Sequence, residues 1–360
     1  MHSELKTALL HYWLTGMRGG EKVLEELCRM FVDADIYTHA CIPEQISDVI
    51  TTHSIHESFI SRLPKGRTNC QTYLPLMPLA QRQWDLSGYD LIISSESGPV
   101  KGIRKPHNCR HICYCHTPMR YLWDFFDEYY MNSGIWEKTA MKVFKSYLRR
   151  YDLKSAECVD QFIANSRFVA ERIRRIYRRE SVVIYPPVDV SYFRDIPDLE
   201  RKHYLFVGQL VCYKRPDLVV SSFAKLQRET LVVVGEGPLR KYLEKQSSSN
   251  VRFLGCVSRE ELRTLYASAK ALIFPGIEDF GIVPVEAMAS CCPVIAMNYG
   301  GAVESVVEGK TGVLMRKQST DCILNAIEEV ASRIWASADF HKHTAPFAPE
   351  YFYRQINEIV

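Results

Sequence analysis

The sequence predicts an α/β protein with two doubly wound, Rossmann-like domains. Short continuous apolar runs alternate with amphipathic helical stretches along the 360 residues, a pattern typical of parallel sheets built from βα units. A proline pair at 186–187 interrupts the alternation, and a second βα series begins after it. The length also suits two domains of ordinary size.

The elements can be placed in order along the chain. In the first half we expect strands at 89–95, 111–115 and 161–165, and helices at 20–31 and 166–177. In the second half we expect strands within 202–210, 230–238, 250–255, 271–276, 292–297 and 312–315. We therefore predict domains at 1–190 and 191–344, hinged near 187–200, with a helix at 345–360. Open α/β sheets bind ligands beyond the carboxyl ends of their strands, so two facing sheets would bind a ligand between them.

Composition excludes several classes of protein. The 47% hydrophobic and 24% charged content is that of an ordered globular chain. No apolar run approaches the ~20 residues of a membrane span, and the N-terminus lacks a signal-peptide pattern, so we expect a cytoplasmic protein. The twelve cysteines are scattered and do not form a disulfide framework. The densest group, Cys109, Cys113, Cys115 and His116, lacks a second ligand pair, so buried thiols are favoured over zinc and no metal is expected.

The net charge is only +3, but basic residues gather at 142–154 and 167–180. Such stretches are usually solvated helix faces. They also fit peripheral contact with an anionic membrane, at its inner face, or a phosphate-bearing acceptor. No nucleic-acid partner is expected, because no zinc-finger or RNP-type motif accompanies the charge.

The stretch FPGIEDFGIVPVEAMAS, residues 274–290, turns from a strand through a loop into a helix. Pro284 suits the first helical turn. Glu286, in or near that turn, needs no function, because a carboxylate there is favourable by ~0.3–1 kcal/mol. Glu278 has no such explanation, and the N–H groups around Phe280 and Gly281 would suit a phosphate. On spacing alone, structural and functional interpretations are equally supported.

Other motifs are weaker. Gly235-x-Gly237 follows a strand, but Arg240 stands where a dinucleotide fingerprint has its third glycine, and no P-loop is present. Asp33 and Asp35 mimic a metal-binding D-x-D but more simply end a helix. A single histidine is usually structural, although His116 follows a strand end. The glycines before the helix at 20–31 either make a turn or let the backbone approach a phosphate; they are Gly16, Gly19 and Gly20.

Together these pieces resemble a family 4 retaining glycosyltransferase of the GT-B fold. The resemblance covers nearly the whole chain and rests on the E-x7-E spacing from Glu278 to Glu286 and on these segments: GGEKVLEEL, CYCHTPMRYLWD, FIANSRFVAERI, FVGQLVCYKRPDLVV, VVVGEGPL and GGAVESVVEGKTGVL.

The resemblance implies a role for each matching residue. Glu286 should hold the nucleotide ribose and Glu278 the hydroxyls of the donor sugar. Lys214 should bind the diphosphate, and His116 should lie close to the transferred sugar. The remaining donor contacts should come from a glycine loop in the first domain and from backbone amides in the second; they are Gly19, Gly20, Phe280, Gly281 and Ile282. The terminal helix at 345–360 should cross back to the first domain.

One position departs from the family pattern. Family members usually carry an arginine after Gly208, where this chain has Gln209. The uncharged amide puts one phosphate contact in doubt, and Arg215 beside Lys214 is the candidate replacement.

The resemblance also implies the chemistry. Lys214 and oriented N–H groups would stabilise the leaving phosphate without a metal or another cofactor. No well-placed carboxylate nucleophile is obvious, so we predict retention by front-face attack. The segments HTPMRYLWD and 74–90 resemble bacterial O-antigen and exopolysaccharide mannosyltransferases, which favours GDP-mannose and a polyprenyl-diphosphate-linked or glycan acceptor. The alternatives are a UDP-sugar-dependent transferase, a non-catalytic sugar-nucleotide-binding protein, and an epimerase or phosphorylase of the same fold.

Overall fold

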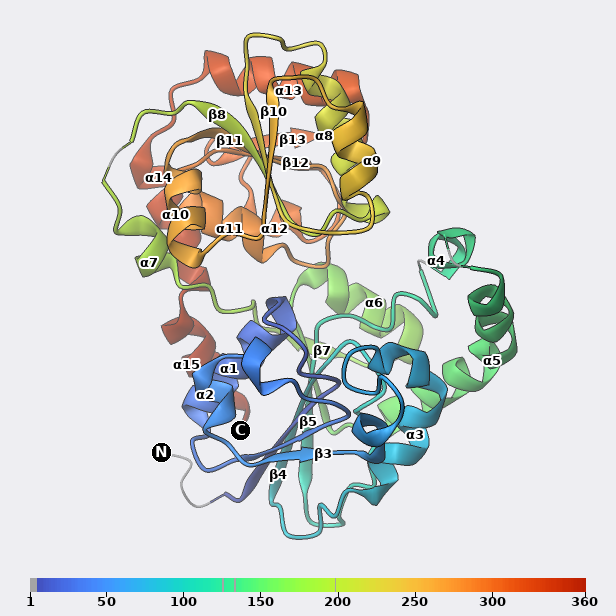
Figure 1. Cartoon of the computed structure of the whole chain (residues 1–360). Coiled ribbons are helices and arrows are strands. Elements are labelled where there is room, and N and C mark those ends of the chain that lie inside the picture. Colours follow the sequence, from blue (N-terminus) through green and yellow to red (C-terminus); the bar gives the residue numbers. More distant parts are fainter. Residues whose placement is uncertain (1–4, 125, 133, 198) are drawn as a thin grey trace. The chain divides into compact units, whose positions relative to one another are not determined.

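The computed structural model describes residues 5–124, 126–132, 134–197 and 199–360 (Figure 1). The chain separates into two compact units, Met1–Ile184 and Tyr185–Val360. Each contains one parallel β-sheet with helices in its crossovers, which confirms the predicted class of two Rossmann-like domains. The finer boundaries at 190 and 344, and the return of 345–360 to the first domain, remain predictions.

The first unit has a seven-stranded parallel sheet in the order β3-β2-β1-β4-β5-β6-β7. Its strands are β1 Thr7–His11, β2 Asp35–Thr38, β3 Ile55–Glu57, β4 Leu91–Glu96, β5 Arg110–Cys115, β6 Gln161–Ala164 and β7 Ser181–Val183. Its α-helices are α1 Gly19–Met30, α2 Asp48–Thr51, α3 Met77–Ala80, α4 Phe126–Asn132, α5 Ile135–Glu157 and α6 Arg167–Tyr177. Short 3₁₀ turns complete it: η1 Pro43–Gln45, η2 Phe59–Arg62, η3 Cys70–Leu76 and η4 Gln81–Gln83.

The second unit has a six-stranded parallel sheet in the order β10-β9-β8-β11-β12-β13. Its strands are β8 His203–Val207, β9 Leu231–Val234, β10 Val251–Gly255, β11 Ala269–Phe274, β12 Val294–Met297 and β13 Gly312–Met315. Its α-helices are α7 Val190–Arg194, α8 Pro216–Phe223, α9 Arg240–Gln246, α10 Arg259–Ala267, α11 Ile282–Ala289, α12 Ala302–Ser305, α13 Thr320–Ser332, α14 Ser337–Thr344 and α15 Pro349–Ile359. Two 3₁₀ turns are η5 Cys212–Lys214 and η6 Ala345–Phe347.

The continuous apolar runs reflect sheets that are buried on both faces. In β8, Leu205 and Val207 pack into one apolar cluster, whereas Tyr204 and Phe206 pack into another. Alternate side chains of a strand point to opposite faces, so a strand covered on both sides needs apolar residues at every position. The same reasoning located the predicted strands, whose observed ends differ from the predicted ends by only a few residues.

The cysteines form no disulfide, and seven of them are buried. All twelve are free thiols, and Cys113 and Cys115 are buried in one apolar cluster with Phe162, as predicted. Within the described residues no group of three or more histidine, cysteine or acidic side chains is arranged to hold a metal ion. Among the same residues, no helix combines the length and apolarity that crossing a membrane requires.

A buried ionic network ties the long helix α5 to the sheet of the first unit. Lys101 is fully buried, and its Nζ lies 3.0 Å from Glu96 Oε1 and 2.5 Å from Asp152 Oδ1. Asp152, on α5, also accepts hydrogen bonds from Trp123 Nε1 at 2.8 Å and from the Tyr177 hydroxyl at 3.0 Å. Because Glu96 is the last residue of β4, this network holds a strand end, a loop and two helices together.

The network predicts that the free energy of unfolding depends strongly on Lys101. The Lys101→Ala variant leaves two buried carboxylates without their counter-ion, and we expect it to lose about 3–5 kcal/mol of unfolding free energy in urea denaturation. The matched control is Lys105→Ala. Lys105 pairs with Asp160 near the surface at 2.6 Å, and an exposed pair contributes only about 0–1 kcal/mol. Equal losses in the two variants would contradict this role of Lys101.

Candidate functional site

The loop between β11 and α11, residues 275–281, is the centre of the site in the second unit. It lies at the carboxyl end of β11, where open α/β sheets place ligands. Glu278 projects from it, and its Oε1 lies 3.0 Å from Lys214 Nζ on η5. The two side chains are only 17% and 16% exposed, so this ion pair is partly shielded from water. The structure thus joins two residues that the sequence placed 64 positions apart.

Glycines let other backbone segments reach this loop. A Cβ at Gly276 would lie 2.9 Å from Lys214 Cα, and a Cβ at Gly301 would lie 2.2 Å from the Asp279 carbonyl oxygen. The Gly301 N–H also donates to the Glu278 carbonyl at 2.8 Å. No other residue type fits at such distances. The Gly300-Gly301 pair is therefore part of the site, which the sequence did not single out.

Glu286 is buried and lies in the second turn of α11. The helix begins at Ile282 after Gly281, whose φ is +94°, and its first turn contains no acidic residue. Glu286 therefore lies near the first turn, as expected, but not in it. The helix-start explanation for this carboxylate is weakened, because the dipole effect falls off within the first turn. The hydroxyl of Tyr266, from α10, donates to Glu286 Oε2 at 3.1 Å. Burial, and then the adjacent Glu286, raises the pKa of Tyr266 well above its ordinary value, so Tyr266 stays a hydrogen-bond donor.

The start of α11 presents backbone donors. Within the described residues, the N–H groups of Phe280, Gly281 and Ile282 have no backbone acceptor, as expected ahead of a helix. The ring of Phe280 is buried, 5.5 Å from the ring of Tyr185 and 5.4 Å from that of Phe347. The buried ring anchors the loop, and the amides without a backbone acceptor remain available as hydrogen-bond donors ahead of the helix.

The turn after β8 supplies Lys214 and its neighbours. Gly208 has a φ of +152°, and a Cβ there would lie 3.1 Å from Lys214 Nζ. Gln209 is exposed. Arg215 donates to both carboxylate oxygens of Asp217, at 3.0 and 2.9 Å. Any phosphate contact by Arg215 would have to compete with Asp217, and the replacement of the missing arginine by Arg215 stays a prediction.

The first unit brings together a separate set around Gly20. His116 follows β5; its N–H donates to the Glu96 carbonyl at 2.8 Å, and its Nε2 lies 2.9 Å from Ser95 Oγ. A Cβ at Gly20 would lie 3.4 Å from His116 Nε2 and 3.0 Å from the Tyr12 hydroxyl. The predicted Gly20 and His116 are therefore neighbours, while Gly19 is the exposed first residue of α1.

Two members of this cluster were missed from the sequence. His11, the last residue of β1, is fully buried, stacks on Tyr12 with ring centroids 4.3 Å apart, and lies 6.5 Å from the His116 ring. Neither ring nitrogen of His11 forms a hydrogen bond within the described chain, and its Nε2 lies 3.9 Å from buried Glu21. The sequence did carry an indication of His11, because this histidine ends the apolar run at 7–11, and polar residues at strand ends are candidates for a site.

Other sequence candidates have structural roles. Asp35 opens β2, accepts a hydrogen bond from the Tyr89 hydroxyl at 2.6 Å, and lies 3.5 Å from His56 Nε2. These contacts give Asp35 a structural role and disfavour the D-x-D interpretation; Asp33 is exposed. Gly235 has a φ of +127°, and a Cβ there would lie 2.0 Å from the Gly208 carbonyl, so it serves the packing of two strand ends.

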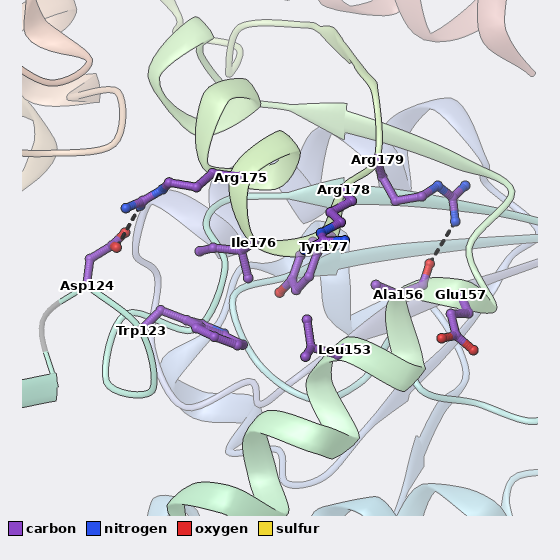
Figure 2. A pocket seen from close by; sticks show the side chains of 10 residues that line it. All are labelled: Trp123, Asp124, Leu153, Ala156, Glu157, Arg175, Ile176, Tyr177, Arg178 and Arg179. Carbon is purple, nitrogen blue, oxygen red and sulfur yellow. Dashed lines mark hydrogen bonds and ion pairs between the residues drawn. The ribbon is translucent and has the colours of Figure 1, made fainter.

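A groove of about 570 Å³ between α5 and α6 is separate from these residues (Figure 2). Its lining contains none of the predicted site residues, and Figure 2 shows Arg175 joined to Asp124 and Arg179 to the backbone of Ala156. Its ten lining residues are Trp123, Asp124, Leu153, Ala156, Glu157, Arg175, Ile176, Tyr177, Arg178 and Arg179. We therefore place the candidate site at the strand ends and not in this groove.

The two halves of the chain match two family profiles. Residues 17–192 match Glycosyltransferase Family 4, and residues 193–339 match Glycosyl transferases group 1. Among curated proteins, a GDP-mannose-dependent alpha-(1-6)-phosphatidylinositol monomannoside mannosyltransferase of Mycobacterium tuberculosis is 31% identical over 199 residues, covering 44% of this chain and 52% of that protein. A D-inositol 3-phosphate glycosyltransferase of Mycobacterium leprae is 30% identical over 196 residues, covering 48% and 46%. The chain thus spans about half the length of these relatives.

Solved structures resemble the chain along nearly its whole length. A sucrose-phosphate synthase of Thermosynechococcus elongatus aligns with a TM-score of 0.74 at 20% identity, over 98% of both chains. The HepE protein of Anabaena, in complex with UDP-glucose, aligns with a TM-score of 0.71 at 18% identity, also over 98% of both chains. At these identities the likeness establishes the fold.

The site predicts a characteristic pH dependence. Burial, and then the nearby His11, lowers the pKa of His116 to about 3, whereas an unfolded histidine titrates near ~6.5. The unfolded chain therefore binds an extra proton between these values, and the stability due to neutral His116 is lost as the pH falls through this window. From pH 7 to pH 5 we expect wild type to lose about 2 kcal/mol more unfolding free energy than His116→Gln.

The comparison isolates His116, because the pKa values of His39 and His111, lowered by burial to about 3 and about 4, act equally in both proteins. Urea denaturation at the two pH values gives the difference. An NMR titration in which the His116 ring protonates near its ordinary pKa would contradict the prediction.

Proposed function

We propose that this chain, whose residues 17–192 and 193–339 match glycosyltransferase profiles, is a family 4 glycosyltransferase. It would move a hexose, mannose from GDP-mannose, onto a lipid-linked or oligosaccharide acceptor with retention of configuration. The observation that carries the proposal is the Lys214–Glu278 ion pair. It lies beside the unpaired amides that begin α11, so one small region offers a cation, hydrogen-bond donors and a carboxylate.

These groups match the parts of a sugar nucleotide. A diphosphate needs positive charge and N–H donors, which Lys214 and the amides of Phe280, Gly281 and Ile282 offer. Sugar and ribose hydroxyls need acceptors, which the carboxylates of Glu278 and Glu286 offer. Because Tyr266 already donates to one oxygen of Glu286, that carboxylate is held in a fixed orientation for a further donor.

The proposed chemistry follows from where charge develops. Breaking the bond between the sugar and the diphosphate leaves negative charge on the phosphate and positive charge on the sugar ring. Lys214 and the amides stabilise the phosphate in place before the bond breaks, which is the efficient arrangement for charge stabilisation. The acceptor hydroxyl attacks from the face that the phosphate leaves, and its proton passes to that phosphate. No covalent sugar adduct is part of this route, so trapping one would contradict it.

His116 and Gly20 are proposed to serve the sugar end of the donor. The lowered pKa of His116 keeps its ring neutral, so that it can exchange hydrogen bonds with hydroxyl groups without adding charge beside a cationic transition state. Gly20 leaves open the space in front of Tyr12 and His116 that a side chain would fill.

The choice of mannose and GDP is supported by the relative from Mycobacterium tuberculosis, whose name specifies GDP-mannose. The match covers only about half of that relative, so the donor needs a direct test. A UDP-sugar donor would keep the same roles for Lys214 and Glu278. A non-catalytic sugar-nucleotide-binding protein is the alternative from another class, and the uncharged Gln209 favours it slightly.

A thermal-shift panel with GDP, UDP, ADP and NAD, without added metal, tests the nucleotide. A ligand at about 100 times its Kd adds ~2.7 kcal/mol of stability, which raises Tm by about 5–10 °C for a unit of this size. We expect that shift with GDP and not with NAD, and no loss of it when EDTA is added. A shift with UDP alone would replace the donor, and a response to NAD alone or to no nucleotide would overturn the proposal.

Substitutions at the ion pair separate nucleotide binding from sugar transfer. Lys214→Ala removes a charge-assisted contact of about 1.5–3 kcal/mol, so GDP affinity should fall by about 10-fold to 150-fold. Glu278→Ala frees Lys214 from its partner, so GDP should bind at least as tightly as to wild type, while consumption of GDP-mannose falls by about 100-fold or more.

The matched controls in the same unit are Lys225→Ala and Glu328→Ala, two exposed residues. Both should leave GDP affinity and donor consumption unchanged. If Glu278→Ala keeps full turnover, Glu278 is not part of the sugar site; if wild type binds GDP but consumes no donor, the non-catalytic alternative is favoured.

A further inference from the structure

We propose that the outer surface of α4 and α5 docks the protein on an anionic membrane. We call this surface the α4–α5 face, and define it by the exposed residues Met131, Ile135, Lys142, Val143, Tyr147, Arg150 and Lys154. The proposal concerns a surface outside the candidate site and does not depend on the identity of the donor.

The first observation is the exposure of large apolar side chains. Ile135 is 82% exposed, Val143 65% and Tyr147 47%, and Met131, near the end of α4, is 74% exposed. Single exposed apolar residues are ordinary. These three α5 residues, however, are spaced by eight and four positions, which places them on one side of the helix. A concentration of this kind marks an interaction surface.

The second observation is charge. Lys142, Arg150 and Lys154 are exposed on the same side of α5. Of the acidic residues of this helix, Asp152 is fully buried against Lys101, and Glu157 lies at the last residue of the helix, in the α5–α6 groove; the side chain of Glu137 lies outside the described part. The described exposed charges between residues 138 and 154 are therefore all positive.

Three further cations flank the face, and they and Lys142 lie over aromatic rings. Lys138 and Lys142 lie over the ring of Tyr130, Lys145 over Phe126, and Arg149 over Trp123, with cation-to-centroid distances of 5.7, 5.2, 3.3 and 4.7 Å. The aromatic residues come from α4 and the loop before it. This packing holds the lysines and the arginine close to the helix surface. Among the described residues, α4 also carries an exposed carboxylate, Asp127.

The combination selects a lipid surface among possible partners. Anionic headgroups satisfy the cations, and the acyl boundary just below them accepts Ile135 and Val143. A nucleic-acid backbone would satisfy the cations alone, because it offers aliphatic side chains no apolar environment. With six basic residues in α5, the helix is suited to lie on a membrane and not to cross it.

The fold presents this helix as a rigid element. The inner side of α5 is fixed by Leu148, by Asp152 in the Lys101 network and by buried Ser155. Leu153, 41% exposed, extends the face into the α5–α6 groove, where Figure 2 shows Arg178 and Arg179 on the opposite wall. Docking therefore requires no unfolding and continues the basic character toward α6.

The test is sedimentation of the full chain with vesicles of phosphatidylglycerol and phosphatidylcholine, compared with phosphatidylcholine alone. The vesicles contain neither acceptor nor nucleotide, so their binding and the nucleotide panel can fail independently. We expect binding only to the phosphatidylglycerol vesicles, weakened by added salt because the charges act near the surface.

Two double variants test the two components. Val143→Ser with Tyr147→Ser should weaken vesicle binding by about 10-fold or more through lost apolar insertion, and Lys142→Gln with Arg150→Gln by about 30-fold through lost attraction. The matched controls in the second unit are Tyr242→Ser with Leu254→Ser, and Lys202→Gln with Lys225→Gln, which alter residues of comparable exposure and should bind like wild type.

Equal binding of wild type to both kinds of vesicle, or to neither, would overturn the proposal. So would wild-type binding by both α4–α5 variants, or losses of the same size in the controls. If light scattering instead shows a dimer that Val143→Ser with Tyr147→Ser converts to a monomer, and vesicles are not bound, the face is a self-association surface and the membrane proposal is wrong.

Discussion

Contact between backbones fixes the loop between β11 and α11, and the rest of the second-unit site depends on it. Gly276 lies against the backbone of Lys214, and Gly301 lies against the backbone of Asp279 and Phe280. A side chain at either glycine would push the segments apart and break the geometry that brings Lys214 within 3.0 Å of Glu278. Specific chemistry at this site is therefore set by the absence of side chains as much as by their presence.

The two units use electrostatics in opposite ways. The second unit places a lysine and a glutamate 3.0 Å apart and partly accessible, which suits a ligand that carries both phosphate and hydroxyl groups. The first unit keeps His116 neutral by burial and by the proximity of His11, and its fully buried charges form the Lys101 network. Only the former arrangement can neutralise a leaving phosphate, which is why the proposed donor contacts concentrate after β8 and β11.

The sequence predicted those features that depend on the course of the backbone. Apolar runs located the strands, and strand ends located Glu278 and His116, because parallel strands bring their carboxyl ends to one edge. It did not predict the bond from Tyr266 to Glu286, the stacking of His11 on Tyr12, or the pairing of Arg215 with Asp217. These contacts depend on side-chain packing between elements or on a local rotamer. The spacing of apolar residues in the sequence predicts neither. Glu286 lies just past the first turn, because the helix begins at Ile282, two residues before Pro284.

The buried Lys101 network has an evolutionary consequence. One cation there serves two carboxylates, one at the end of β4 and one in the middle of α5, so replacing any single member leaves an unbalanced charge in the interior. Relatives should therefore keep all three residues or exchange them together for apolar ones. Glu96 also follows Ser95, the partner of His116, and its carbonyl accepts the His116 N–H. Because that acceptor is a backbone carbonyl, the trio can be exchanged without removing this hydrogen bond, so the histidine site and the anchoring of α5 can vary independently.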